Sequence, residues 1–277
     1  MKTVVTHFSP DLDAIASVWL IKRLLPGWNE AQMKFVAAGS TYEKMLPDAD
    51  PNIIHVDTGF GKFDHHQSNE DTSATKLVFE YLSSKNYVPA KHIPALTRLV
   101  EVVNVIDHFG EFYFPEPAAD RYQFMLYEII EGMKASLPDD ILLCERSFPL
   151  FDAVYQLLKN KVHAEGEIKK GFVFQSKLGK TIVMESKNEE TMKLSLMLGY
   201  EVVIRRDPDR GFVRIKTQPK KKFDLTVLSE KLKVADSKAT WFLHASKHML
   251  LNGSSKNPDS VPSTLTLQKL IEIVKAI

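Results

Sequence analysis

One stretch, residues 52–67, constrains the fold of this chain more than any other. It reads Asn-Ile-Ile-His-Val-Asp-Thr-Gly-Phe-Gly-Lys-Phe-Asp-His-His-Gln. Residues 53–56 are typical of a short buried strand, so Asp57 follows at its carboxyl end, where open α/β sheets bind their ligands. A carboxylate there, with His65 and His66 a short turn later, suits a divalent transition metal. Taken alone, the two adjacent histidines are more typical of a polar turn.

A second cluster of the same residue types lies near the N-terminus. Residues 3–6 read as a strand and Pro10 as a break, and we expect Asp13 to cap the helix that follows. His7, Asp11 and Asp13 then share one strand-to-helix loop, again at the carboxyl end of a strand. The two clusters together predict a metal site at one edge of a mostly parallel sheet.

These motifs resemble those of the DHH phosphoesterase superfamily, which includes RecJ-type exonucleases, small-RNA and cyclic-dinucleotide phosphodiesterases and manganese pyrophosphatases. The matching residues, in chain order, are His7-x-x-x-Asp11-x-Asp13, Asp57, Asp64-His65-His66, and Asp107 after the apolar run 103–106. All four motifs occur in the superfamily's order within the first 107 residues.

The resemblance implies two Mn²⁺ ions, with Mg²⁺ as the alternative ion. Residue by residue, it implies that His7 and Asp11 hold one ion, that Asp13, His65 and Asp107 hold the other, and that Asp57 bridges them. Asp57 and His66 are then the catalytic residues, His66 as a hydrogen-bond donor or general acid beside the scissile phosphate. Asp64 is expected to orient a histidine from outside the set of metal ligands and not to bind metal itself.

The alternation of strand and helix patterns predicts an α/β fold. We expect a metal-binding domain over residues 1–120, with a mostly parallel sheet and helices on both faces. A helical connection over 121–166, with breaks at Pro138 and Pro149, leads to a smaller mixed α/β domain over 167–277.

The C-terminal domain is expected to bind substrate. It lacks the glycine-rich pattern that is common in the second domain of DHH enzymes, and its last 80 or so residues resemble the melanocyte-proliferating-gene exonuclease family instead. The candidate phosphate contacts are Arg205, Arg206, Lys247, His248, Asn252 and Ser254. Each of them also fits an ordinary surface position.

The net charge of +1 conceals an asymmetry between the two halves. Residues 1–165 carry 15 Lys and Arg against 23 Asp and Glu, a net charge of −8, whereas residues 166–277 carry 21 against 12, a net charge of +9. An acidic half with metal ligands and a basic half suit cleavage of a polyanion. A solvated lysine surface is the alternative interpretation.

The remaining composition agrees with a cytoplasmic enzyme. The single Cys144 excludes an internal disulfide, and we find neither a signal pattern nor an apolar run long enough to span a bilayer. The oligomeric state is open, with a homodimer as one option.

The sequence therefore predicts a metal-dependent phosphodiesterase or 3′–5′ exonuclease that acts on single-stranded or short oligonucleotides by a two-metal mechanism. The alternatives are a pyrophosphatase-like or cyclic-dinucleotide hydrolase and a non-catalytic nucleotide-binding protein. A structural zinc site fits poorly, because such sites favour cysteine ligands.

Overall fold

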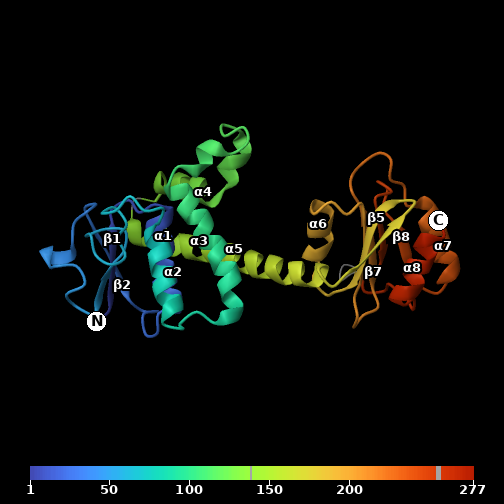
Figure 1. Cartoon of the computed structure of the whole chain (residues 1–277), viewed down its shortest axis with the longest axis horizontal. Helices are drawn as coiled ribbons and strands as arrows, with labels where there is room; N and C mark the ends of the chain where they lie inside the picture. Colours follow the sequence, from blue (N-terminus) through green and yellow to red (C-terminus); the bar gives the residue numbers. More distant parts are fainter. Residues whose placement is uncertain (138, 254–256) are drawn as a thin grey trace. The chain divides into compact units, whose positions relative to one another are not determined.

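The computed structural model describes residues 1–137, 139–253 and 257–277 of the 277-residue chain (Figure 1). The chain divides into two compact units, Met1–Lys159 and Asn160–Ile277, each with its own sheet. The three-part division expected from the sequence stays a prediction. Within the described ranges, no helix combines the length and apolar character that a bilayer span requires.

The sheet of the N-terminal unit has three parallel strands in the order β2-β1-β3. They are β1 (Thr3–His7), β2 (Gln32–Val36) and β3 (Ile53–His55). The central strand β1 is almost entirely buried, and its Val5 is the register partner of both Lys34 and His55. Because all three strands run the same way, the residues that follow β1 and β3 emerge at the same edge of the sheet.

Helix α1 packs on β1 and also contacts α2 and α3, so these elements form the core of the unit. The helices are α1 (Leu12–Leu24), α2 (Ala74–Ser84), α3 (Ile93–Asp107) and α4 (Leu126–Lys134). Four short 3₁₀ turns connect them: η1 (Tyr42–Lys44), η2 (Ala90–His92), η3 (Gly110–Tyr113) and η4 (Asp120–Phe124).

The residue that caps α1 differs from the one expected. The N-cap is Asp11, whose Oδ1 accepts a hydrogen bond from the Ala14 N–H at 3.0 Å. Asp13 lies inside the first turn and is 2% exposed. The prediction that Asp13 caps this helix is therefore wrong, and its carboxylate is available to a different partner, described below.

The long helix α5 (Asp140–Ile168) continues through Pro149, where the sequence predicted a break. Proline inside a helix removes one hydrogen bond and costs about 3 kcal/mol. The part of α5 that follows the proline packs on α1, where the Trp19 ring lies 5.6 Å from Phe151 and 6.0 Å from Tyr155, centroid to centroid. The other expected break, at Pro138, lies outside the described residues.

The sheet of the C-terminal unit has six strands in the order β4-β5-β6-β7-β9-β8. β5 and β6 are parallel and the other neighbours are antiparallel. The strands are β4 (Phe172–Ser176), β5 (Gly179–Glu185), β6 (Val202–Arg206), β7 (Val213–Thr217), β8 (Trp241–Leu243) and β9 (Met249–Asn252).

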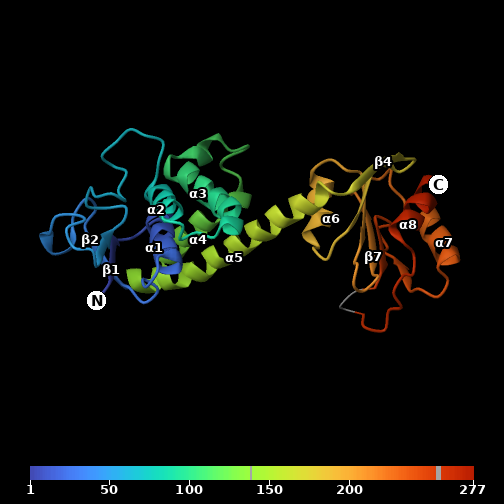
Figure 2. The same cartoon turned by 60° about the horizontal axis from the view of Figure 1, so that its bottom comes forward.

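The two faces of this sheet are covered by different helices, as Figures 1 and 2 show. The helices are α6 (Glu190–Met197), α7 (Thr226–Ala235) and α8 (Leu267–Lys275). Val202 and Ile204 point into the core formed with α7 and α8, whereas Val203 points toward α6. Strand alternation thus assigns each β6 residue to one face. The predicted α/β fold, with a parallel N-terminal and a mixed C-terminal sheet, is confirmed.

The single cysteine yields a test of the packing of α5. Cys144 is fully buried, and burial, with the nearby charges of Asp140 and Glu145, raises the pKa of its thiol to about 12. Because the thiolate is the reactive form, we expect native protein to resist Ellman's reagent and denatured protein to release one thiol per chain. Rapid reaction of the native chain would contradict the packing, and a Cys144→Ala variant supplies the blank.

Candidate metal centre

The first part of the candidate centre comes from the end of β1. The His7 Nδ1 lies 2.9 Å from the Phe8 carbonyl oxygen, and its Nε2 lies 3.2 Å from Asp57 Oδ2. An Nδ1–H that donates to a carbonyl leaves Nε2 facing the carboxylates, the arrangement that is usual for a metal-binding histidine.

Asp57 follows β3 and adopts an uncommon backbone conformation. Its φ is +54°, in the left-handed region, and its N–H donates to the Phe63 carbonyl at 2.9 Å. Left-handed residues other than glycine are infrequent and tend to cluster at functional sites, where the surrounding structure maintains the strain. The turn that this conformation creates returns the chain to Asp64, His65 and His66, beside the Asp57 carboxylate.

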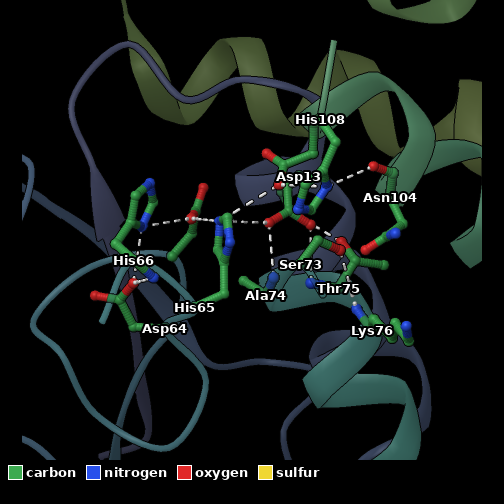
Figure 3. Close-up of polar contacts among 12 residues, drawn as sticks. Asp13, Asp64, His65, His66, Ser73, Ala74, Thr75, Lys76, Asn104 and His108 are labelled. Carbon is green, nitrogen blue, oxygen red and sulfur yellow. Dashed lines mark hydrogen bonds and ion pairs between the residues drawn. The ribbon is translucent and has the colours of Figure 1, made fainter. Parts of the chain in front are cut away.

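The imidazole of His65 lies among carboxylates from three different segments, as Figure 3 shows. Its Nε2 is 3.5 Å from Asp57 Oδ1, 3.4 Å from Asp107 Oδ2 and 3.8 Å from Asp13 Oδ2. Asp107 is the last residue of α3, so this helix delivers its carboxylate to the same sheet edge.

Three sets of side chains in the described residues have the spacing of metal ligands. They are His7, Asp11 and Asp57; Asp13, His65 and Asp107; and Asp57, His65 and His66. Asp57 and His65 each belong to two of these sets, and Asp57 is the carboxylate that two sets share. The structure thus brings together all six expected ligands, while their binding of metal stays a prediction.

Unpaired buried atoms indicate that these residues fit a cation. Asp57 Oδ1, His65 Nε2 and Asp107 Oδ2 are buried and have no hydrogen-bond partner among the described residues. A buried polar atom without a partner typically costs about 1–3 kcal/mol. Three such atoms, all within one ligand cluster, are the donors that a divalent ion would satisfy, and carboxylate with imidazole is a donor set that suits Mn²⁺ and related ions.

The charges of the centre shift several pKa values. Burial raises the pKa of Asp107 to about 6, with the nearby charges of Asp57 and Asp11 adding to the effect and His65 opposing it. Burial alone would lower the pKa of His7, but its bonds to Asp57 and to the Phe8 carbonyl raise it to about 9. These shifts have the directions expected of carboxylates and imidazoles crowded into a partly buried site.

Asp13 has a structural role besides its place near His65. Its Oδ2 and Oδ1 each accept a hydrogen bond at 2.8 Å, from the N–H groups of Ala74 and Thr75 in the first turn of α2. The Thr75 hydroxyl also donates to the Asp13 carbonyl at 3.0 Å. The carboxylate therefore occupies the amino end of a helix, where backbone N–H groups and the helix dipole favour an anion.

His66 is held by Asp64 and faces solvent. Its Nδ1 lies 2.8 Å from Asp64 Oδ1, and its side chain is 55% exposed whereas that of Asp64 is buried. Asp64 Oδ2 accepts a further bond from the Phe60 N–H at 2.7 Å, which fixes the carboxylate in place. The geometry agrees with the expectation that Asp64 orients a histidine rather than binding metal.

A hollow of about 380 Å³ opens beside these residues. It is lined by His7, Asp11, Ala38, Gly39, Asp57, Phe60, Asp64, His66 and Asp107. Its size lies within the range of small-molecule sites. The Phe60 side chain, 55% exposed, adds an apolar wall to an otherwise polar surface.

The expected phosphate contacts of the C-terminal unit are dispersed and mostly paired. Arg206 donates to the Leu265 carbonyl and to Glu185, and Lys247 pairs with Asp224 at 2.9 Å. His248 lies 3.2 Å from the Thr217 hydroxyl. Arg205 is 2% exposed and pairs with Glu189.

Of the two remaining candidates of this unit, one is buried and the other is not described. Asn252 is fully buried, and its amide bonds the backbone of Thr240, Val261 and Ser263, so it holds loops together and offers no atom to substrate. Ser254, with the turn expected around it, lies outside the described residues.

Sequence reasoning missed the anchoring of Asp13 by α2. Ser73 caps α2 through a bond from the Lys76 N–H, and this serine was a recognisable start signal. The pairing with Asp13 joins positions about 60 residues apart, and local patterns carry no information on it.

Metal binding is expected to stabilise the protein. Mn²⁺ at about 100 times its dissociation constant should raise the free energy of unfolding by about 2.7 kcal/mol, because the ion binds the folded centre and not the unfolded chain. We expect a rise in melting temperature when Mn²⁺ is added to EDTA-treated protein, and none in an Asp57→Asn variant. An equal rise in both proteins would contradict a site at Asp57.

The two roles of Asp13 can be separated by measuring stability without metal. Asp13→Ala should lower the free energy of unfolding of EDTA-treated protein by about 1–3 kcal/mol, because two buried N–H groups lose their acceptor. Asp107→Ala should cost less, since the Asp107 Oδ2 accepts no hydrogen bond and burial already disfavours the charged form of this carboxyl. Chemical denaturation measures both values, and equal losses would argue against the anchoring role.

Comparisons with known proteins place the chain in a family. No curated protein matches it. RecJ from Thermus thermophilus, in complex with Mg²⁺, has 12% identity and a TM-score of 0.34, and the match covers 99% of this chain and 49% of that one. The DHH domain of a member of the s1p family of ribosomal proteins has 13% identity and a TM-score of 0.32, covering 99% and 85%.

An exopolyphosphatase-related protein from Bacteroides fragilis has 12% identity and a TM-score of 0.27, covering 98% and 89%. Likenesses this low carry no conclusion about fold or function. The family model that matches, over residues 4–158, is that of ChrB, C-terminal domain, and not a DHH family. Since the match spans more than half of the sequence, the chain belongs to the family of the ChrB C-terminal domain.

Proposed function

We propose that this protein is a metal-dependent phosphoesterase of the DHH type that hydrolyses phosphodiester bonds in single-stranded or short oligonucleotides. The observation that carries the proposal is the convergence of the six expected ligands at one sheet edge, where three buried atoms form no hydrogen bond among the described residues and His65 Nε2 lies 3.4–3.5 Å from the two carboxylate oxygens. The family match names a domain and no reaction, so the proposed chemistry rests on the residues themselves.

The proposed cofactors are two Mn²⁺ ions, with Mg²⁺ as the alternative. His7 and Asp11 would hold one ion, Asp13, His65 and Asp107 the other, and Asp57 both. When bound, such a pair of ions neutralises phosphate oxygens and lowers the pKa of water to generate a nucleophile. Asp57 suits the bridging position because its two oxygens face different imidazoles, Oδ2 toward His7 and Oδ1 toward His65.

His66 is suited to transfer a proton at the mouth of the centre. Its Nδ1 is engaged by Asp64, so Nε2 is the atom left for the phosphate or the leaving oxygen. Asp64 in turn is fixed by the Phe60 N–H, which keeps the imidazole oriented. An exposed, oriented imidazole beside a metal site meets the geometric requirement for a general acid.

The substrate class follows from charge and from the size of the hollow. The C-terminal residues 166–277 carry a net charge of +9, which favours a polyanion, and the hollow of about 380 Å³ at the centre suits one nucleotide rather than a duplex. Oligonucleotides with a free end meet both conditions, and 3′–5′ polarity is the form of attack we propose. A cytoplasmic location is likewise a prediction.

Replacing the shared carboxylate tests the proposal. Asp57→Asn should reduce Mn²⁺-dependent hydrolysis of bis(p-nitrophenyl) phosphate and of a labelled single strand by more than about 100-fold, because even loss of an outer-shell partner commonly costs 10–100-fold. Asp120→Asn, an exposed aspartate of the same unit, is the matched control.

Undiminished hydrolysis by Asp57→Asn, or none by the wild type under any of Mn²⁺, Mg²⁺ and Co²⁺, would refute the assignment. Pyrophosphate and a cyclic dinucleotide belong in the same assay, because faster turnover of either would replace the oligonucleotide as the substrate while leaving the metal chemistry intact.

A further inference from the structure

Two arginines lie directly opposite each other on neighbouring strands of the C-terminal sheet. Arg205 on β6 is the direct register partner of Arg214 on β7. Both lie on the α6 face, since their neighbours Ile204 and Val213 point into the opposite core. Like charges directly opposite each other destabilise an antiparallel pair, so this position needs a compensating anion.

One carboxylate of the chain provides part of that compensation. Glu189, just before α6, pairs with Arg205 Nη2 through Oε1 at 2.5 Å and with Arg214 Nη1 through Oε2. Arg205 Nη1 also donates to the Ser186 carbonyl at 2.6 Å. Two guanidinium charges therefore share one carboxylate, which leaves a surplus of one positive charge.

Each arginine keeps a donor that no described residue satisfies. The Nε atoms of Arg205 and Arg214 are buried and have no hydrogen-bond partner among the described residues. The Arg205 side chain is 3% exposed and that of Arg214 22%, whereas the Glu189 side chain is 52% exposed. The cations are thus fixed in the fold, and the anion between them is the part that can move away.

A cavity of about 420 Å³ opens at this pair. Its lining residues are Lys187, Glu189, Arg205, Asp207, Asp209, Arg210, Phe212 and Arg214, four cationic and three anionic, with a net charge of +1. Lys187 and Glu189 follow the carboxyl end of β5, and Asp207, Asp209 and Arg210 follow that of β6. These are the two parallel strands of the sheet, and the carboxyl ends of parallel strands are where such sheets place ligands.

We propose that this cavity binds the phosphate group of a small molecule, which displaces Glu189 from Arg205 and Arg214. Arginine presents a planar fork of N–H donors that matches phosphate oxygens, and an incoming phosphate can use both guanidinium groups at once. Glu189 is an internal competitor for the same donors. The pocket lies wholly within residues 187–214 and does not depend on the proposed metal centre.

The competition makes two substitutions act in opposite directions. Glu189→Gln should tighten phosphate binding by about fivefold or more, because the competing charge is gone, while Arg214→Gln should weaken it by about tenfold or more, because a charge-assisted contact is lost. Arg214→Lys should fall between Arg214→Gln and wild type, since it keeps the charge and loses the fork.

Calorimetric titration of the full chain tests these expectations, with inorganic phosphate, pyrophosphate and AMP as separate probes. EDTA and an Asp57→Asn background exclude phosphate held at the metal centre. Lys222→Gln, which breaks an exposed pair with Glu201 in the same unit, is the control for a general loss of positive charge. Thermal unfolding of each variant establishes that it is folded.

Stronger binding by Glu189→Gln with weaker binding by Arg214→Gln supports the site. Tighter binding of AMP than of inorganic phosphate then shows that the cavity recognises a nucleotide. Equal binding of the two shows that it recognises the phosphate group alone. No binding of any probe by wild type and Glu189→Gln, unchanged binding in folded Arg214→Gln, or equal weakening by Lys222→Gln would overturn it.

Discussion

Repulsion among four carboxylates is the constraint on which the N-terminal unit depends. Asp11 and Asp13 come from the start of α1, Asp57 follows β3 and Asp107 ends α3, and all four lie at one sheet edge. Two like charges about 4 Å apart repel by about 4 kcal/mol at an effective dielectric constant of about 20, a large fraction of the stability of an ordinary domain. A fold that retains such a cluster must compensate each charge locally, and the arrangement of this unit follows from that need.

Compensation comes from two sources with different consequences. The amino end of α2 holds Asp13 through two N–H groups, which places that helix beside α1 and fixes the carboxylate. Imidazoles compensate Asp57, and burial alone would raise the pKa of this carboxyl, yet His65 and His7 lower it below the usual range. Backbone donors are permanent, whereas an imidazole can lose its proton to solvent when a cation binds in the proton's place. The backbone donors therefore keep Asp13 fixed, and the proposed metal would replace protons on the imidazoles.

The sequence predicted most of this edge because the relevant signals are local. A buried run before Asp57, a loop after His7 and an apolar helix before Asp107 each place one polar residue at an element's end, and parallel strands then bring these ends together. Contacts between distant positions carried no such signal.

The arginine pocket escaped prediction for the same reason, although Arg205 was singled out. The register of β6 and β7 places Arg214 opposite Arg205, and the packing of α6 brings the counter-ion Glu189 to them. Both depend on tertiary structure, which local sequence patterns do not reveal. Both sites nonetheless lie near the carboxyl ends of parallel strands, and in both the chain's own groups of opposite sign only partly neutralise the central charges, which are aspartates in one unit and arginines in the other. Imidazoles partly neutralise the carboxylates in the N-terminal unit, and Glu189 partly neutralises the arginines in the C-terminal unit. Incomplete neutralisation of charge lowers stability in both units. A bound cation at the N-terminal site and a bound anion at the C-terminal site would compensate the remaining charge.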